Sequence, residues 1–245
     1  MKSWVFASRN LKELVRDPLN IAFSLGFPLA VLLLFSLIGA NVPQSPFKIE
    51  IMAPGVAVFG LSFISLYSGM LISKDRVGSF LMRLFTAPLS SSNFIAGYII
   101  PLLPIAVLQS AVCFLASIAL GLEASVNILL ALVTLIPISG FFIGIGLLMG
   151  SVFNDKQVSA VCGALLTNLS AWLSGAWFEL SLIGGAFESI AYLLPFAHAV
   201  DAARAAISGD YGAIFPHLWW VIGYAIIALA LAIAVFKSKM YGDKA

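Results

Sequence analysis

Long uncharged, apolar segments alternate with short charged ones along this chain. Six segments lack Asp, Glu, Lys and Arg altogether and have 22 or more residues each: 18–47, 51–73, 84–122, 124–154, 157–178 and 211–236. A helix needs roughly 20 apolar residues to cross the hydrocarbon core of a bilayer. The pattern therefore predicts six transmembrane helices, near residues 21–40, 54–73, 94–121, 126–153, 157–178 and 217–236. The runs are continuously apolar rather than alternating, which favours helices over a β-barrel.

Composition and charge agree with a membrane protein. Hydrophobic residues make up 61% of the chain and charged residues 10%, whereas soluble domains carry about 25% charged residues. With the N-terminus placed inside, all but two of the 13 Lys and Arg residues fall in inner segments, the exceptions being Lys48 and Arg204. This positive-inside bias predicts that both termini are cytoplasmic. We expect an all-α integral membrane protein with one transmembrane domain, residues 1–245, in the cell (plasma or inner) membrane.

The first 18 residues have the pattern of an amphipathic helix. At 100° per residue, one face carries Trp4, Ala7, Leu11, Leu14 and Val15, and the opposite face carries Lys2, Arg9, Lys12, Glu13 and Arg16. Such a helix, apolar on one side and basic on the other, suits the membrane interface. Pro18 then ends it, because proline disfavours a continuing helix. Residues 1–18 are therefore predicted to form an interfacial helix, the simpler alternative being a basic anchor segment.

The segment 74–92 lies between the second and third predicted spans and is unusually charged for this chain. Its apolar positions follow helical spacing: Val77, Phe80, Leu81, Leu84 and Phe85. Pro88 ends this second amphipathic helix. A short inner helix with an apolar and basic surface is suited to docking another protein, although a helix that only skims the membrane has the same periodicity.

The outer segment 179–216 predicts two short helices, separated by Gly184-Gly185 and Pro195 and too short to cross a membrane. We expect a re-entrant pair that acts as an outer gate, with a purely structural cap as the alternative. The candidate gate residues are Pro195, His198, Asp201 and Arg204. Asp201 and Arg204, at i and i+3, suit a helix-surface ion pair.

Three motifs in order resemble the permease subunits of type-2 ATP-binding-cassette (ABC-2) exporters. They are "SRNLKELVRDPLNIAFSLGFPL", "KDRVGSFLMRLFTAPLSSSNFIAGYI" and "LPFAHAVDAARAAISGD". The resemblance covers essentially the whole chain. It implies that the loop between spans two and three is a coupling helix, which docks on an ATPase and carries its motion to the spans.

The resemblance also implies functional residues and partners. The candidate coupling residues are Asp75, Arg76, Gly78, Phe80, Arg83, Thr86 and Pro88, with Arg9, Lys12, Glu13 and Arg16 adding contacts from the interfacial helix. The chain has no G-x-x-x-x-G-K-[ST] motif, so we expect no cofactor here and expect ATP and Mg to bind a separate cytoplasmic ATPase, two copies per complex. Six spans make half a permease, so a second half, identical or related, is implied.

Small polar residues mark two spans as candidates for the substrate path. They are Ser62 and Ser65 in span two, and Thr167, Asn168, Ser170, Ser174 and Trp177 in span five. Such residues also serve ordinary helix packing, as do the pairs Gly140/Gly144 and Gly146/Gly150 in span four. Cys113 and Cys162 fall inside spans and are expected to be buried thiols.

The middle of each predicted span carries no charged residue, which favours amphipathic or apolar cargo over an ion relay. The sequence thus predicts a permease for a drug-like natural product, a lipid or a related molecule. Polysaccharide or glycolipid export by the same mechanism is one alternative. A lipid-modifying membrane enzyme using His198 and Asp201 is another, and a passive channel is a third. No metal site and no nucleic-acid partner are expected.

Overall fold

A computed structural model describes residues 2–42, 47–77 and 91–242, and every regular element in these ranges is a helix. In chain order they are α1 (Lys2–Val15), α2 (Pro18–Ile21), the π-helix η1 (Ala22–Gly26), α3 (Phe27–Asn41), α4 (Ile49–Val77), α6 (Ser91–Ala119), α7 (Asn127–Val152), α8 (Asp155–Val158), the π-helix η2 (Ser159–Leu166), α9 (Thr167–Leu173), the 3-10 turn η3 (Leu180–Leu182), α10 (Gly185–Leu193), α11 (Pro195–Ser208) and α12 (Tyr211–Gly242). The predicted all-α class is confirmed.

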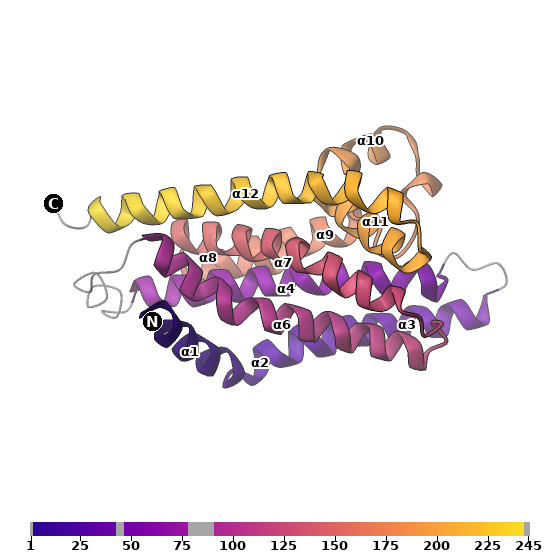
Figure 1. Cartoon of the computed structure of the whole chain (residues 1–245), viewed down its shortest axis with the longest axis horizontal. Coiled ribbons are helices and arrows are strands. Elements are labelled where there is room, and N and C mark those ends of the chain that lie inside the picture. Colours follow the sequence, from indigo (N-terminus) through magenta and orange to yellow (C-terminus); the bar gives the residue numbers. More distant parts are fainter. Residues whose placement is uncertain (1, 43–46, 78–90, 243–245) are drawn as a thin grey trace.

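Five helices in the described ranges are long and apolar enough to cross a membrane. They are Ala22–Asn41, Ile49–Arg76, Asn93–Ala119, Asn127–Val152 and Tyr211–Ser238. These match five of the six predicted spans. Figure 1 shows the long helices side by side, with α1 starting and α12 finishing at the same end of the bundle. We call this the N/C end, and the opposite end, where α10 and α11 lie, the far end.

The expected fifth span, 157–178, is built differently from the other five. Its residues form α8, η2 and α9, and the helix stops at Leu173. Polar Thr167, Asn168 and Ser170 dilute its apolar character, and Gly175, with φ +65°, turns the chain. This segment is not among the five helices above, yet it runs alongside α7 from the N/C end towards the far end (Figure 1).

At the far end, α10 and α11 form the expected pair of short helices. They are bent by 87° relative to one another, and together they count as a sixth candidate span only if the bent pair is taken as one. Pro195 occupies the first turn of α11, where the missing backbone N–H costs nothing. Their predicted insertion into the outer leaflet stays a prediction.

Helix α4 forms the centre of the bundle. In its most apolar stretch 89% of residues are buried, against 17% for the span containing α3 and 22% for α12. It approaches α7 backbone to backbone, since a Cβ on Gly146 would lie 2.0 Å from the carbonyl oxygen of Ser65, and one on Gly150 would lie 2.2 Å from that of Gly69. The predicted close packing at Gly146 and Gly150 is confirmed; Gly140 faces open space instead.

Serines of α4 support this contact. Ser62, Ser65 and Ser68 are fully buried, and each hydroxyl donates to the backbone carbonyl three residues earlier, at 2.6 to 2.9 Å. Ser68 also lies 3.2 Å from the carbonyl oxygen of Ile143 in α7. Their polar atoms are therefore satisfied by the helices themselves.

Helix α1 presents a buried face and an exposed apolar face. Phe6, Ala7, Asn10 and Leu14 are buried against the bundle. Trp4, Leu11 and Val15 remain exposed, Trp4 at 69%. The predicted apolar face is thus divided between the protein and its surroundings, as expected of a helix that packs on a bundle while lying in a membrane interface.

Candidate functional site: a polar cluster at the N/C end and an aromatic cavity

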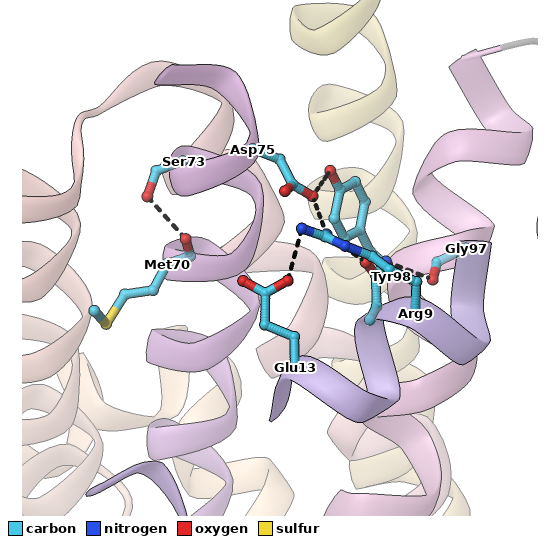
Figure 2. Close-up of polar contacts among 8 residues, drawn as sticks. Arg9, Glu13, Met70, Ser73, Asp75, Gly97 and Tyr98 are labelled. Atoms are coloured by element: carbon cyan, nitrogen blue, oxygen red, sulfur yellow. Dashed lines mark hydrogen bonds and ion pairs between the residues drawn. The ribbon is translucent and has the colours of Figure 1, made fainter. Parts of the chain in front are cut away.

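A cluster of charged and polar side chains joins three helices at the N/C end. Arg9 of α1 donates from Nη1 to Oδ2 of Asp75 in α4 at 2.8 Å. The Tyr98 hydroxyl of α6 donates to the same oxygen at 2.9 Å. Figure 2 shows the Arg9 guanidinium reaching between Asp75 and Glu13, whose Oε2 lies 2.7 Å from Arg9 Nη2. We call Arg9, Glu13, Asp75 and Tyr98 the inner cluster.

Burial makes this cluster energetically important. The Asp75 side chain is only 3% exposed, whereas that of Arg9 is 37% exposed. A buried carboxylate is tolerated when it is both paired and hydrogen-bonded. Asp75 meets both conditions only while α1, α4 and α6 keep their relative positions.

A second contact fixes α1 on α6. The fully buried Asn10 donates from Nδ2 to the carbonyl oxygen of Gly97 at 3.1 Å, and its Oδ1 accepts from Arg9 Nη1 at 2.9 Å. Phe6 packs edge-on against Tyr98, with ring centroids 4.9 Å apart. A Cβ on Gly97 would lie 2.4 Å from the Phe6 ring, so this approach requires glycine.

The last turns of α4 also hold α7 and α8. Arg76 donates from Nη1 to the carbonyl oxygens of Gly150 at 2.9 Å and Phe153 at 3.4 Å, which suits a cation at a helix C-terminus. The Ser73 hydroxyl hydrogen-bonds Asp155. The end of α4 is therefore bonded to elements on two sides, directly before the segment expected to dock an ATPase.

The structure brings together part of the predicted coupling set. The ion pairs of Arg9 hold Glu13 and Asp75 together, and Arg76 is bonded to the end of α7. Lys12 of α1 and Arg16, directly after α1, are exposed. A surface groove of about 690 Å³ is lined by Arg9, Lys12, Glu13, Arg16, Asp17 and Pro18. Gly78, Phe80, Arg83, Thr86 and Pro88 lie outside the described residues, so their coupling role stays a prediction.

An aromatic cavity of about 610 Å³ opens between α3, α4 and the η2–α9 segment. Its lining comprises Phe23, Phe27, Val31, Phe35, Phe47, Phe59, Phe63, Gly163, Thr167, Asn168, Ala171, Trp172, Trp177 and Phe178. Trp177 stacks on Phe35 with centroids 5.3 Å apart and meets Phe59 edge-on at 4.9 Å. Among the residues that the structure describes, no charged side chain lines the cavity.

Three of the predicted path residues line this cavity, namely Thr167, Asn168 and Trp177. Ser170 and Ser174 do not; both are buried, and their hydroxyls lack a hydrogen-bond partner among the described residues. Ser62 and Ser65 are not among the lining residues either and are fully buried in α4.

The aromatic lining itself was missed in the sequence. The usable signal was the spacing of Phe23 with Phe27 and of Phe59 with Phe63, four residues apart within two spans. Side chains at i and i+4 share one helix face, so each pair predicts an aromatic stripe.

A second polar cluster, which we call the far cluster, comprises Tyr192, Asp201 and Arg204 and holds segments of the far end together. Arg204 donates from Nη2 to the carbonyl oxygen of Gly175 at 2.6 Å and from Nε to that of Ile51 at 3.2 Å. Its Nη1 lies 3.5 Å from Asp201, which confirms the pair expected from i, i+3 spacing. The Tyr192 hydroxyl donates to Asp201 Oδ2 at 2.7 Å.

The arrangement of His198 does not resemble a catalytic base with its carboxylate partner. His198 Nε2 lies 3.0 Å from the carbonyl oxygen of Tyr192, and Nδ1 lies 2.8 Å from His217 Nδ1. Because a carbonyl only accepts, Nε2 carries the proton, and in the neutral ring Nδ1 accepts from His217. Both nitrogens therefore have structural partners, and neither hydrogen-bonds Asp201.

Comparison with known proteins places the chain in a family of transporters. The model of the ABC-2 type transporter family matches residues 2–208. The ABC transporter G family member 20 of Dictyostelium discoideum is 26% identical over 207 residues, which cover 80% of this chain and 28% of that protein. This chain thus spans less than a third of the curated relative it matches. The matched region includes the inner cluster, the aromatic cavity and the far cluster, and the chain belongs to the ABC-2 type transporter family.

Proposed function

We propose that this chain is the membrane-spanning subunit of an ATP-driven exporter, and that the aromatic cavity receives an amphipathic or apolar cargo. The observation that carries the proposal is the uncharged, ring-lined cavity between α3, α4 and α9. Its volume of about 610 Å³ falls within the roughly 300–1,000 Å³ typical of sites for drug-sized ligands.

The lining favours a compact amphiphile over a polysaccharide. A sugar needs a hydrogen-bond partner for most of the hydroxyls it buries. Among the described lining side chains, only Thr167, Asn168 and the two tryptophan N–H groups are polar. Thr167 and Asn168 already donate to backbone carbonyls, at 2.9 and 2.8 Å.

Energy is supplied, in this proposal, by a cytoplasmic ATPase that docks at the N/C end. The basic groove of α1 and the segment after α4 form the docking surface, and the inner cluster transmits movement of α1 to α4 and α6. Two ATPase copies and a second permease half, identical or related, complete the complex. Both termini are cytoplasmic, and the complex resides in the plasma or inner membrane.

Co-purification tests the partner. The full chain is extracted from its native membrane in mild detergent, and the proteins that accompany it are identified by mass spectrometry. We expect a near-stoichiometric ATPase that is lost from the Arg83→Ala variant and kept by Lys48→Ala, a charge removed from the opposite side. Isolation of the chain alone in several detergents would contradict the proposal.

A transport assay tests the cavity. Vesicles containing the complex take up rhodamine 6G, an amphipathic dye, when ATP is added. Phe63→Ala and Trp177→Ala should each lower ATP-dependent uptake several-fold while basal ATP hydrolysis persists, because they remove stacking surface without touching the N/C end. Phe215→Ala, an exposed phenylalanine outside the cavity, is the matched control. If Phe63→Ala and Trp177→Ala take up the dye as fast as Phe215→Ala, the cavity is not part of the transport path.

A further inference from the structure

A second cavity, separate from the aromatic one, lies where α1 meets the first span. It has a volume of about 210 Å³ and lies between α1, η1, α4 and α6. Its lining is Leu14, Val15, Ile21, Ser24, Leu25, Tyr67, Leu102, Ile105 and Leu108. For scale, an apolar cavity of about 150 Å³ in another protein accepts benzene, so this one has room for a stretch of hydrocarbon chain.

One polar atom at this cavity is buried and unsatisfied. The Tyr67 side chain is 4% exposed, and its hydroxyl has no hydrogen-bond partner among the described residues. Ser24 is close to it. The Ser24 hydroxyl donates to the carbonyl oxygen of Ile21 at 3.3 Å and keeps lone pairs that can accept, but the Tyr67 hydroxyl does not meet hydrogen-bond geometry with it. A buried hydroxyl without a partner is unfavourable, so Tyr67 calls for a ligand that carries an acceptor.

Basic side chains lie next to this cavity, on α1 and directly after it. Leu14 and Val15 of the cavity alternate with Lys12 and Arg16 of the surface groove. Lys12 and Arg16 are exposed, while Arg9 and Glu13 are engaged in the inner cluster. Asp17 also lines the groove, so the two exposed cations outnumber this further anion.

The exposed stripe of α1 sets the depth of these groups. Trp4, Leu11 and Val15 face outward from the bundle, as in helices that lie in the interface of a membrane. With α1 in the interface, we infer that Lys12 and Arg16 reach the level of lipid headgroups and that the cavity lies where acyl chains begin.

We propose that this cavity is a binding site for an anionic glycerophospholipid of the adjacent leaflet. One acyl chain occupies the apolar cavity, an ester carbonyl accepts the hydrogen bond of Tyr67, and the phosphate lies against Lys12 and Arg16. The three features occur in the order in which a phospholipid presents them: charge, ester, hydrocarbon. Such a lipid joins α1 to α4 and α6 at a cavity that shares no lining residue with the aromatic one.

Native mass spectrometry of the full chain tests this site, with phosphatidylglycerol as the probe and phosphatidylcholine for comparison. We expect wild-type protein to retain one phosphatidylglycerol per chain, with at least tenfold preference over phosphatidylcholine. The Lys12→Gln/Arg16→Gln variant should lose that preference, and Tyr67→Phe should weaken retention about 3- to 10-fold, the effect of one hydrogen bond.

Two further variants complete the design. Leu108→Trp places a larger side chain in the cavity, and it should abolish lipid retention. Because Leu108 is already largely exposed, the substitution does not disturb the packing of the protein core. Lys156→Gln removes an exposed charge near the same N/C end, on α8, and should have no effect. Circular dichroism confirms that each variant is folded.

Two outcomes would overturn the proposal. One is equal retention of both lipids by wild-type protein. The other is loss of phosphatidylglycerol in the charge variant while Leu108→Trp and Tyr67→Phe behave as wild type, which would indicate adsorption to a basic surface only. No ATPase and no transport enter this measurement, so its result is independent of the proposed export function.

Discussion

The two ends of the bundle use the same three residue types in different ways. At each end a tyrosine hydroxyl donates to an aspartate that faces an arginine: Tyr98 and Asp75 with Arg9, and Tyr192 and Asp201 with Arg204. In the inner cluster the ion pair joins residues of different helices, 66 positions apart. In the far cluster the pair lies within one helix, three positions apart, and Arg204 reaches other segments through their backbone carbonyls.

This difference determines what movement costs at each end. Separation of α1 from α4 leaves the buried carboxylate of Asp75 without its cation, so the two helices are held together by a charge. Separation of α11 from α4 leaves Asp201 and Arg204 still paired and breaks one hydrogen bond to a carbonyl. The inner end is therefore suited to transmit movement as a unit, and the far end to open one contact at a time.

Replacement of Arg9 should have the largest effect. Arg9→Met leaves Asp75 buried with only the Tyr98 hydroxyl, and a hydrogen bond to a charged group contributes about 1.5–3 kcal/mol. We expect the free energy of unfolding in detergent to fall by about 2–3 kcal/mol and transport per ATP hydrolysed to fall with it.

Asp75→Asn is the matched control for Arg9→Met. The amide has the shape of the carboxylate and still accepts from Tyr98, and Arg9 keeps its ion pair with Glu13. The free energy of unfolding should therefore fall by only about 1 kcal/mol. An Arg9→Met loss no larger than that of Asp75→Asn would show that the inner ion pair does not hold α1 to α4.

Replacement of Arg204 ranks second. Arg204→Met removes the donors to Gly175 and Ile51, but Asp201 is 20% exposed and keeps Tyr192, so water can complete its solvation. The expected loss is about 1–2 kcal/mol, measured by the same unfolding assay. Coupling of transport to ATP hydrolysis should persist, and a variant that uncouples as fully as Arg9→Met would remove the distinction between the two ends.

A smaller effect is expected at His198. His198→Ala deletes the contacts to Tyr192 and His217 and the ring packing on Trp220, whose centroid lies 5.2 Å away. We expect a loss of about 1 kcal/mol and transport near the wild-type rate. If lipid-modifying chemistry were present and vanished in this variant, His198 would have to be regarded as catalytic.

The long helices were predictable because their signal is local. Charge-free runs located α3, α4, α6, α7 and α12, and the helical spacing of apolar residues located α1. The segment 157–178 was expected as one continuous helix, whereas the structure builds residues 155–173 from α8, η2 and α9. Apolar length does not reveal a π-helix or the turn at Gly175. Those features depend on how the backbone packs against α4.

The contacts of the site were likewise predictable only where they are local in the sequence. Asp201 and Arg204 were recognisable as a pair from their spacing of three. Nothing local pairs Arg9 with Asp75, because that contact depends on which face of α1 packs on α4 and α6. The spacing argument placed Ala7 and Leu14 on the same face as Trp4 and Val15, whereas the structure buries the first two and exposes the others.

The finest test deletes one hydroxyl at each end. Tyr98→Phe and Tyr192→Phe remove the same atom from the same kind of contact, at 2.9 and 2.7 Å from the carboxylate. Because its hydrogen bond is shorter, distance alone would predict the larger fall in free energy of unfolding for Tyr192→Phe. Burial argues the opposite, because Asp75 is 3% exposed and Asp201 is 20% exposed, so water can replace the hydroxyl only at the far end. We expect losses of about 1 kcal/mol for Tyr98→Phe and about half that for Tyr192→Phe, measured by unfolding in the same detergent. The reverse order would mean that the bond lengths, and not the solvent exposure of the two carboxylates, distinguish the two ends.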